Sequence, residues 1–344
     1  MGSPGSVRSR SPSALLVATG IGLLRVDASG REVLVGKVPD GARPTCLSVD
    51  PHHPGRAWAG TVERGILRSV DGGLTWVESG LAGIHVTAVT AASAREGLVW
   101  AGTEPSAVFR SEDGGGRWHH AEDLTFLPSS DGWAFPPRPE THHVRWIASH
   151  PGDADRLWVA VEAGALVRTR DGGISWIDRT EDGPRDTHEL GAHPHRPELL
   201  RVAAGDGYFE SSDGGETWAA PREGLEVGYF RSVAVDPGNP EVVVLSGATR
   251  PRSTYMAGHS DGRVFRREGH GPWVRVPAGW PDPPETIAPL LIAGSSPGEF
   301  WAADERGVHM SVDGGRSWSL AVRFDPRPSN LRGLALLPAA RPTG

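Results

Sequence analysis

An eight-residue pattern with an Asp-Gly-Gly core and a closing Trp recurs five times, and it constrains the fold more than any other feature. The copies occupy residues 69–76, 111–118, 169–176, 211–218 and 311–318. Repeats of this spacing belong to arrays in which no single unit buries its own apolar face and neighbouring units must stack. We therefore expect one domain built of repeated units.

Composition favours short strands joined by turns. With 46 Gly, 30 Pro and 13 Trp among 344 residues, the chain carries too many helix breakers for a helical protein and enough apolar volume for a core. Cys46 is the single cysteine, so an internal disulfide and paired-thiol zinc or redox motifs are excluded. Lys37 is the single lysine, which argues against Schiff-base chemistry and pyridoxal phosphate. We expect no nucleotide or haem cofactor.

Charge and hydropathy exclude two classes of partner. The net charge of −7 argues against nucleic acid, which binds clustered positive charge. The sequence has no run of about 18 apolar residues that would span a membrane. Residues 14–24 have the look of a short signal peptide, but they align with the repeat strands at 57–60 and 65–68, so we interpret them as part of the fold. We expect a soluble, cytoplasmic monomer.

The repeat units share one order of elements. Each has a first strand ending near a Pro, a second strand such as 98–102, a third such as 107–110, the Asp-Gly-Gly turn and a short fourth strand, which is typical of a propeller blade. Successive turns carry acids at 27, 71, 113, 171, 213, 268 and 313, so they are 44, 42, 58, 42, 55 and 45 residues apart. We predict an all-β, seven-bladed β-propeller over residues 13–338, with a disordered tail at 1–12 and a second tail at 339–344.

The two ends of the chain predict how the ring closes. The first unit begins at its second strand, near residues 15–18, whereas residues 331–337 form a first strand without a unit of its own. One blade is therefore expected to be built from both ends, which removes the open sheet edges that template aggregation.

The Ser-x-Asp-Gly-Gly-x-Thr/Ser-Trp pattern resembles the Asp-box, or BNR repeat, of sialidases, sortilin-type receptors, xyloglucanase-like glycosidases and the photosystem II assembly factor family. The resemblance extends over roughly the whole chain. It implies a propeller in which the box is a structural hairpin clamp. The residue chemistry agrees, because Asp accepts N–H groups of its own turn, Gly takes the positive φ and Trp covers the hairpin. Such a fold does not define an activity.

The first strand of each blade lies nearest the propeller axis, so its polar residues are the candidates for a site. Because side chains alternate along a strand, residues two apart share a face. Buried charges on these strands need compensation by acids or by an anionic ligand. Counting back six residues from the closing Pro selects Thr45, Arg145, His188, Arg231 and Arg332, with Thr87 as the equivalent in the third blade; two residues earlier come Arg43, His85, His143, Asp186, Tyr229 and Asn330.

Acids and two insertions are expected on the same face as the starts of these strands. Glu104 and Glu162 occupy equivalent turns between second and third strands, whereas the Asp-Gly-Gly turns fall on the opposite face. The long intervals come from loops at 119–142, which contains Trp133, and at 247–258. Long loops in a compact fold are commonly lids or binding loops. We expect a covered pocket at the channel mouth.

The predicted chemistry combines an anion site with a divalent metal. We expect a small anionic ligand to be gripped by arginines, as in the arginine triad of sialidases. Three histidines with Glu162 or Asp186 could hold zinc or a similar ion, with an open position for substrate. Such a site suits epimerisation, retro-aldol cleavage or hydrolysis. The candidates are Arg145, Arg231, Arg332, Arg43 and Trp133 for substrate; His85, His143, His188 and Glu162 for the metal; and Glu162, Tyr229 and His188 for catalysis.

Structural and functional alternatives stay open at this point. The histidines could be hydrogen-bonded structural residues, the arginines could form inter-blade ion pairs with Glu162, Asp186 or Glu189, and a register slip of one residue would replace His143 by His142. The chain could be a non-catalytic ligand-binding or assembly propeller. It could also be an exo-glycosidase, with Tyr229 and Glu162 in the roles that a sialidase assigns to Tyr and Glu. The Phe-Arg-Ile-Pro signature of sialidases is absent, and that family closes with six blades.

Overall fold

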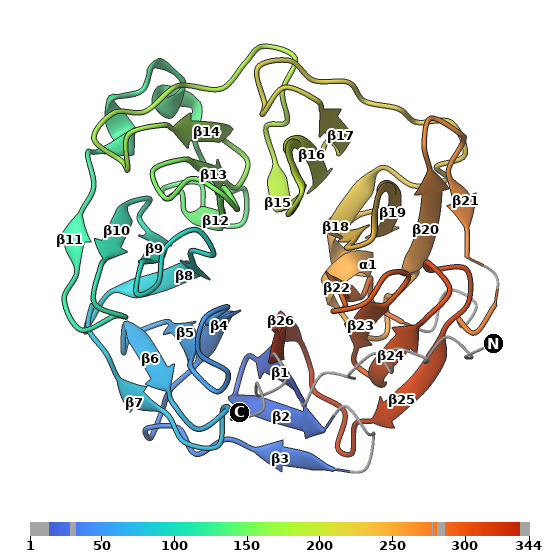
Figure 1. Cartoon of the computed structure of the whole chain (residues 1–344), viewed down its shortest axis with the longest axis horizontal. Coiled ribbons are helices and arrows are strands. Elements are labelled where there is room, and N and C mark those ends of the chain that lie inside the picture. Colours follow the sequence, from blue (N-terminus) through green and yellow to red (C-terminus); the bar gives the residue numbers. More distant parts are fainter. Residues whose placement is uncertain (1–13, 28–31, 277, 281–285, 338–344) are drawn as a thin grey trace, which may run out of the picture.

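The strands form a closed ring of seven blades around a central channel (Figure 1). The computed structural model describes residues 14–27, 32–276, 278–280 and 286–337. The tails predicted at 1–12 and 339–344 lie outside these residues. The seven-bladed, all-β architecture predicted from the repeat spacing is confirmed.

Blade 1 is built from both ends of the chain, as predicted. Strand β26 at the red end of the chain pairs antiparallel with β1 at the blue end, so that the sheet order is β26-β1-β2-β3 (Figure 1). Blades 2 and 3 each take four consecutive strands. The strands are β26 (Leu331–Leu337), β1 (Ala14–Thr19), β2 (Gly22–Asp27) and β3 (Val33–Val35); β4 (Pro44–Val49), β5 (Ala57–Thr61), β6 (Ile66–Ser69) and β7 (Val77–Glu78); and β8 (His85–Ala91), β9 (Val99–Glu104), β10 (Val108–Ser111) and β11 (His119–His120).

Blades 4 and 5 have three strands each, and blades 6 and 7 have four. In blades 4 and 5 the outer edge is reduced to single bridges, Arg168 with Ile177 and Glu210 with Ala219. The strands are β12 (Val144–Ser149), β13 (Leu157–Val161) and β14 (Ala165–Thr169); β15 (Thr187–His193), β16 (Arg196–Ala204) and β17 (Gly207–Ser211); β18 (Tyr229–Asp236), β19 (Asn239–Ala248), β20 (Arg263–Glu268) and β21 (Val274–Arg275); and β22 (Leu290–Ala293), β23 (Phe300–Asp304), β24 (Gly307–Ser311) and β25 (Ser319–Arg323).

The Asp-Gly-Gly turn closes on its own carboxylate. In blade 2, Asp71 Oδ1 accepts the backbone N–H groups of Leu74 (3.1 Å) and Thr75 (2.9 Å). Gly73 has a φ of 87°, which costs glycine little and other residues more. Trp76 is buried over the hairpin and donates from Nε1 to the Gly73 carbonyl at 3.0 Å. The turn is therefore a structural clamp in this chain.

Tryptophans of the second strands seal the contacts between blades. Trp58, Trp100 and Trp301 are almost completely buried, and Trp158 nearly so. Trp58 Nε1 donates to the carbonyl of Gly114, in the turn of the next blade, at 3.1 Å. These tryptophans are therefore core residues at the contacts between blades. The apolar clusters lie between the blades, and the polar ends of the first strands lie near the axis.

Among the described residues, no helix has the length and apolar character needed to cross a bilayer. The helical segments are short: α1 (Pro251–Tyr255) and two 3-10 turns, η1 (Leu124–Phe126) and η2 (Pro128–Gly132). All three belong to the two insertions. Helix α1 lies on the channel side of blade 6 (Figure 1).

Candidate functional site

A β-bulge interrupts six of the seven first strands at the same place. The pairing of each strand with its neighbour skips one residue, next to the face that carries the turns between second and third strands. A bulge bends the strand and re-aims the side chain of the extra residue. The bulged residues are the ones that counting back from the closing Pro selects: Thr45, Thr87, Arg145, His188, Arg231 and Arg332.

Four of these bulged residues have a structural task. Each donates a hydrogen bond to a backbone carbonyl near the start of the first strand of the next blade. These bonds tie adjacent blades together near the axis. They run from Thr45 to Val86, from Thr87 to Val144 (2.6 Å), from His188 Nδ1 to Phe230 (2.5 Å) and from Arg231 to Ala288 (2.6 Å), and Arg231 also reaches Leu331 (2.7 Å).

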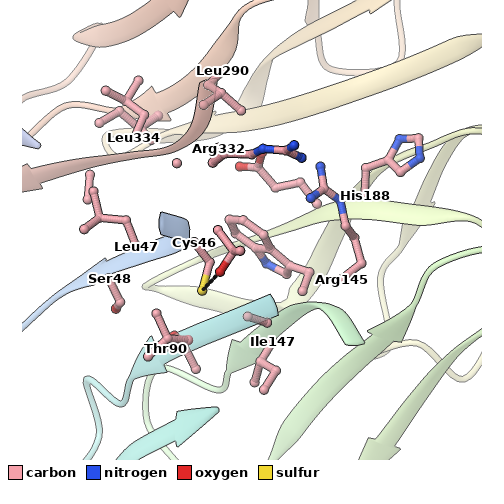
Figure 2. Close-up of a pocket in the computed structure, with 18 of the residues that line it drawn as sticks. Cys46, Leu47, Ser48, Thr90, Arg145, Ile147, His188, Leu290, Arg332 and Leu334 are labelled. Carbon is pink, nitrogen blue, oxygen red and sulfur yellow. Dashed lines mark hydrogen bonds between the residues drawn. The ribbon is translucent and has the colours of Figure 1, made fainter. Parts of the chain in front are cut away.

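Arg145 and Arg332 depart from this pattern. In the part of the chain that the structure describes, neither guanidinium donates to a carbonyl of the next blade. Arg145 lies beside Glu162, with 3.6 Å between Nε and Oε2. Arg332 has no acid partner among the described residues and is reached by solvent from the channel. Figure 2 shows their guanidinium groups directed toward one another.

The charge of Arg145 disfavours the charge of Arg332. The protein around Arg332 displaces water, and the charge of Arg145 adds repulsion, so the pKa of Arg332 is lowered. Burial also works against the charge of Arg145, but Tyr255 and the carboxylate of Glu162 outweigh it and raise the pKa of Arg145. Two positive charges therefore lie beside each other, and among the described residues only Arg145 has an acid partner, Glu162.

In blades 1 to 4, the polar residue two positions before the bulged residue has its partner within its own blade. In blades 2, 3 and 4 a basic residue at the start of the first strand faces the acid in the turn between the second and third strands. In blade 1, Asn330 Oδ1 accepts from the backbone N–H of Gly20 at 2.8 Å. The charged pairs are Arg43 with Glu63 (2.9 Å), His85 with Glu104 (3.3 Å) and His143 with Glu162 (2.8 Å).

Glu162 is the most strongly held acid of the channel. Burial alone would raise its pKa, but the hydrogen bond from His143 and the nearby Arg145 and His188 lower the pKa of Glu162 to about 2. The side chain is therefore a carboxylate at neutral pH. A group this acidic is a weak proton acceptor, so it suits charge stabilisation, nucleophilic attack or metal ligation better than general-base catalysis.

His188 presents one ring nitrogen to the site. Nδ1 donates to the Phe230 carbonyl, so Nε2 carries the lone pair in the neutral ring and accepts from the Tyr229 hydroxyl at 3.1 Å. Burial lowers the pKa of His188, which keeps the ring neutral at pH 7. Nε2 also lies 3.7 Å from Asp186 Oδ1 and 3.9 Å from Glu162 Oε1.

Tyr229 and Asp186 have pKa values shifted in the same direction. Burial, reinforced by Tyr255 and Asp186, raises the pKa of Tyr229, so its hydroxyl stays protonated and acts as a donor. Burial also raises the pKa of Asp186, although His188 opposes this, and the charge of Glu162 adds to the rise. The two carboxyls, Glu162 and Asp186, thus have opposite shifts.

Two cavities meet at the level of Arg145 and Arg332, which line both. The outer one has a volume of about 580 Å³ and lies at the face of the turns between second and third strands. The inner one, of about 310 Å³, continues along the first strands. Its wall is apolar, with Leu47, Ile147 and Leu290 around it (Figure 2).

Both insertions lie at the channel mouth, as predicted. From the first, Phe135 packs edge-on against His143 with ring centres 4.8 Å apart, and Arg138 pairs with Glu104 at 2.6 Å. From the second, Tyr255 lies 6.2 Å from Tyr229 between ring centres. Phe135, Arg138 and Tyr255 all line the outer cavity.

Several predicted substrate residues have other surroundings in the structure. Trp133 is buried in the apolar cluster of blades 3 and 4, where its Nε1 donates to Ser129 at 3.1 Å, and it does not reach the cavity. Arg231 is buried and committed to carbonyls, and Arg43 is paired with Glu63 at the rim. Arg145 and Arg332 are therefore the arginines that line both cavities without bonding to a carbonyl of the next blade among the described residues.

The structure also separates the predicted metal residues. His85 belongs to the Glu104 pair and His143 supports Glu162 from behind, while Glu162 and His188 converge with Asp186 instead. The predicted register is correct, because His143 and not His142 pairs with Glu162. Sequence reasoning placed Asp186 near the axis and gave it as the alternative to Glu162 in the metal site, but it did not include Asp186 in the final ligand set and did not single out Tyr255. Tyr255 lies in an insertion with no repeat equivalent, and Asp186 differs from the basic residues that mark its position in blades 2 to 4.

No protein-family model matches the sequence, and no curated protein matches it. Several solved structures share its fold. A GH74 enzyme of Niastella koreensis superposes with a TM-score of 0.67 at 16% identity over 92% of this chain. The GH74 xyloglucanase of Xanthomonas campestris gives a TM-score of 0.69 at 14% identity over 95% of this chain. YCF48 bound to D1 peptide gives a TM-score of 0.58 at 18% identity, covering 83% of both chains.

These likenesses establish the fold class. The chain spans about half the length of the GH74 enzymes, 55% and 53%. Together with the seven sheets, they define a seven-bladed β-propeller whose polar channel residues lie at one mouth. The neighbours include both glycoside hydrolases and YCF48, so an enzymatic and a ligand-binding role are both compatible with the fold.

Proposed function

We propose that this chain is an Asp-box propeller that binds a small carboxylate-bearing molecule in its channel and acts on it there. One observation carries the proposal. The other four bulged residues donate hydrogen bonds to the next blade, whereas Arg145 and Arg332 do not do so among the described residues. Neither guanidinium ties one blade to the next, Arg332 has no acid partner among the described residues, and the two groups line the same cavities. A bound carboxylate would pair with both and relieve their mutual repulsion.

The neighbouring side chains supply acid–base chemistry. His188 Nε2 is the candidate base, because its ring is neutral and its lone pair faces the site. Tyr229 is the candidate donor, and Glu162 supplies a fixed negative charge. This set favours reactions that form a carbanion next to a carboxylate, in which the base removes either the Cα proton, as in epimerisation, or the proton of a β-hydroxyl while the Cα–Cβ bond breaks, as in retro-aldol cleavage.

Binding of the anion is tested by ¹⁹F NMR titration with trifluoroacetate, which is a minimal carboxylate probe. We expect Arg332→Gln to weaken binding about tenfold or more, the equivalent of one charge-assisted hydrogen bond. Arg43→Gln is the matched control, because it removes the same charge from the same mouth but from an arginine already paired with Glu63. Equal weakening by both substitutions would show that only the general positive potential attracts the probe.

Glycoside hydrolysis is the second candidate, favoured by one observation. The carboxyls of Glu162 and Asp186 lie within 4.8 Å of each other and have oppositely shifted pKa values, which is the arrangement of a nucleophile and an acid in a retaining glycosidase. Tyr229 does not suit the nucleophile role, since its raised pKa keeps it protonated. Cleavage of aryl glycosides or an aryl sialoside by the wild type, abolished by Glu162→Gln, would support this candidate over the first.

A further inference from the structure

Three potential ligands converge where blades 4 and 5 meet the channel. Glu162 comes from the turn after β13, Asp186 immediately precedes β15, and His188 is the bulged residue of β15. One ligand atom from each lies within 4.8 Å of the other two. From His188 Nε2 the distance is 3.7 Å to Asp186 Oδ1 and 3.9 Å to Glu162 Oε1.

The surroundings orient all three atoms toward one another. His188 is 1% exposed and donates its Nδ1 proton to a backbone carbonyl, so the lone pair of the ring lies on Nε2, where a bound ion would take the place of the hydrogen bond from Tyr229. A metal-bound histidine characteristically has such a carbonyl behind it. His143 holds Glu162 Oε2 at 2.8 Å, so that Oε1 is the oxygen turned toward His188. Asp186 Oδ1 is held by the backbone N–H of Ala163 at 2.9 Å.

The three atoms are electron-pair donors, and their proximity needs a cation or a proton to stabilise it. The Tyr229 hydroxyl donates a hydrogen bond to His188 Nε2 and, among the described residues, to neither carboxylate. Arg145 approaches Glu162 at Oε2, whereas Oε1 is the oxygen nearest to His188. Ligands bound to one ion at about 2.1 Å stand roughly 3.0–3.7 Å apart. The two distances from His188 Nε2 are already close to this range, and the oxygens of Glu162 and Asp186, which lie within 4.8 Å of each other, would have to approach by up to about 1 Å.

We propose that Glu162, Asp186 and His188 bind one divalent transition-metal ion, with Mn²⁺ and Zn²⁺ as the ions that two carboxylates and one imidazole suit best. Three protein ligands leave coordination positions open, and Glu162 lines the outer cavity, from which a substrate oxygen would approach. The ligand set replaces His85 and His143 of the sequence prediction by Asp186. The site goes beyond the proposed anion binding, because it uses neither Arg145 nor Arg332. With the ion bound, His188 Nε2 is a ligand, so its role as a base belongs to the metal-free protein.

The experiment is a Mn²⁺ titration of untagged, chelator-treated protein followed by electron paramagnetic resonance, in which bound ion removes the sharp signal of free Mn²⁺. We expect one Mn²⁺ per wild-type chain. Asp186→Asn keeps the acceptor for Ala163 and the shape of the side chain, and it should weaken binding more than the 10- to 100-fold that changes behind a ligand cause. His85→Gln, at the equivalent position of blade 3 in the Glu104 pair, should bind as the wild type does.

The second readout is the visible absorption of bound Co²⁺, which reports on the ligands of the ion. With Co²⁺ in place of Mn²⁺, the visible absorption bands of the wild type should be lost in Asp186→Asn and kept in His85→Gln. The absence of stoichiometric binding in the wild type, or equal binding in Asp186→Asn, would overturn the proposal. Trifluoroacetate titration of the metal-free protein reports on Arg145 and Arg332, so failure of the metal site is distinguishable from failure of the anion site.

Discussion

A protonated carboxyl inside the channel wall should make the stability of this propeller fall as pH rises. Glu189 is 8% exposed on β15, next to His188, and accepts from Ser232 Oγ at 2.5 Å. Burial is the dominant influence; it outweighs the Ser232 hydrogen bond and the charges of Arg145 and Arg231, and raises the pKa of Glu189 from 4.5 to about 8.

The size of the effect follows from linkage between protonation and folding. Because the carboxyl binds its proton more tightly in the folded state, its contribution to stability is fully present below pH 4.5 and is lost as the pH rises through about 8. At about 1.4 kcal/mol per pKa unit, the total is roughly 5 kcal/mol. About 3–4 kcal/mol of that should be lost between pH 5.5 and pH 8.5.

Urea unfolding of the wild type and Glu189→Gln at these two pH values measures the loss. Gln is uncharged, has the same shape and accepts from Ser232, so the variant should lack most of the pH-dependent loss. Glu63→Gln, an exposed acid at the channel rim, should keep the wild-type dependence. If wild type and Glu189→Gln lose the same free energy of unfolding between pH 5.5 and pH 8.5, Glu189 is ionised in the folded protein and the reasoning fails.

Three further outcomes are expected from the scaffold. Deleting residues 331–344 removes β26, which pairs with β1 along its length, so the thermal unfolding transition should lose its cooperativity; a wild-type melting curve would contradict closure by this strand. Arg231→Gln should cost about 3 kcal/mol or more in urea unfolding, because it leaves two buried carbonyls unsatisfied, whereas Arg332→Gln should change stability by less than about 0.5 kcal/mol; similar losses would refute the division of roles. Asp71→Ala should lower the unfolding free energy by about 1–2 kcal/mol through its turn hydrogen bonds, and Glu78→Ala, an exposed acid of the same blade, should not; equal effects would argue against the clamp.

The number of blades and the closure of the ring could be predicted because they depend on spacing. The Asp-Gly-Gly turns repeat at intervals that one blade explains, and a first strand at 331–337 has no other unit to join. The positions near the axis were also predictable, since the closing Pro gives the register of each first strand. The bulges give a physical reason for this success, because they place the same residue of each strand toward the axis.

The roles of individual side chains could not be predicted from spacing. Arg231 and Arg332 occupy equivalent positions, yet only Arg231 has backbone carbonyls within reach, since that depends on how the next two blades pack. Trp133 was expected in the pocket because it lies in a long loop, but the loop folds back and buries it among core residues. Tyr255 enters the site from helix α1, for which the repeat offers no template.

The most direct test of the account is a crystal structure of the protein soaked with trifluoroacetate. We predict that the carboxylate lies in the channel and bridges Arg145 and Arg332, at the level where the two cavities meet. An anion bound at the rim beside Arg43, with no density between Arg145 and Arg332 at saturating probe, would contradict the claim that these two arginines form the ligand site.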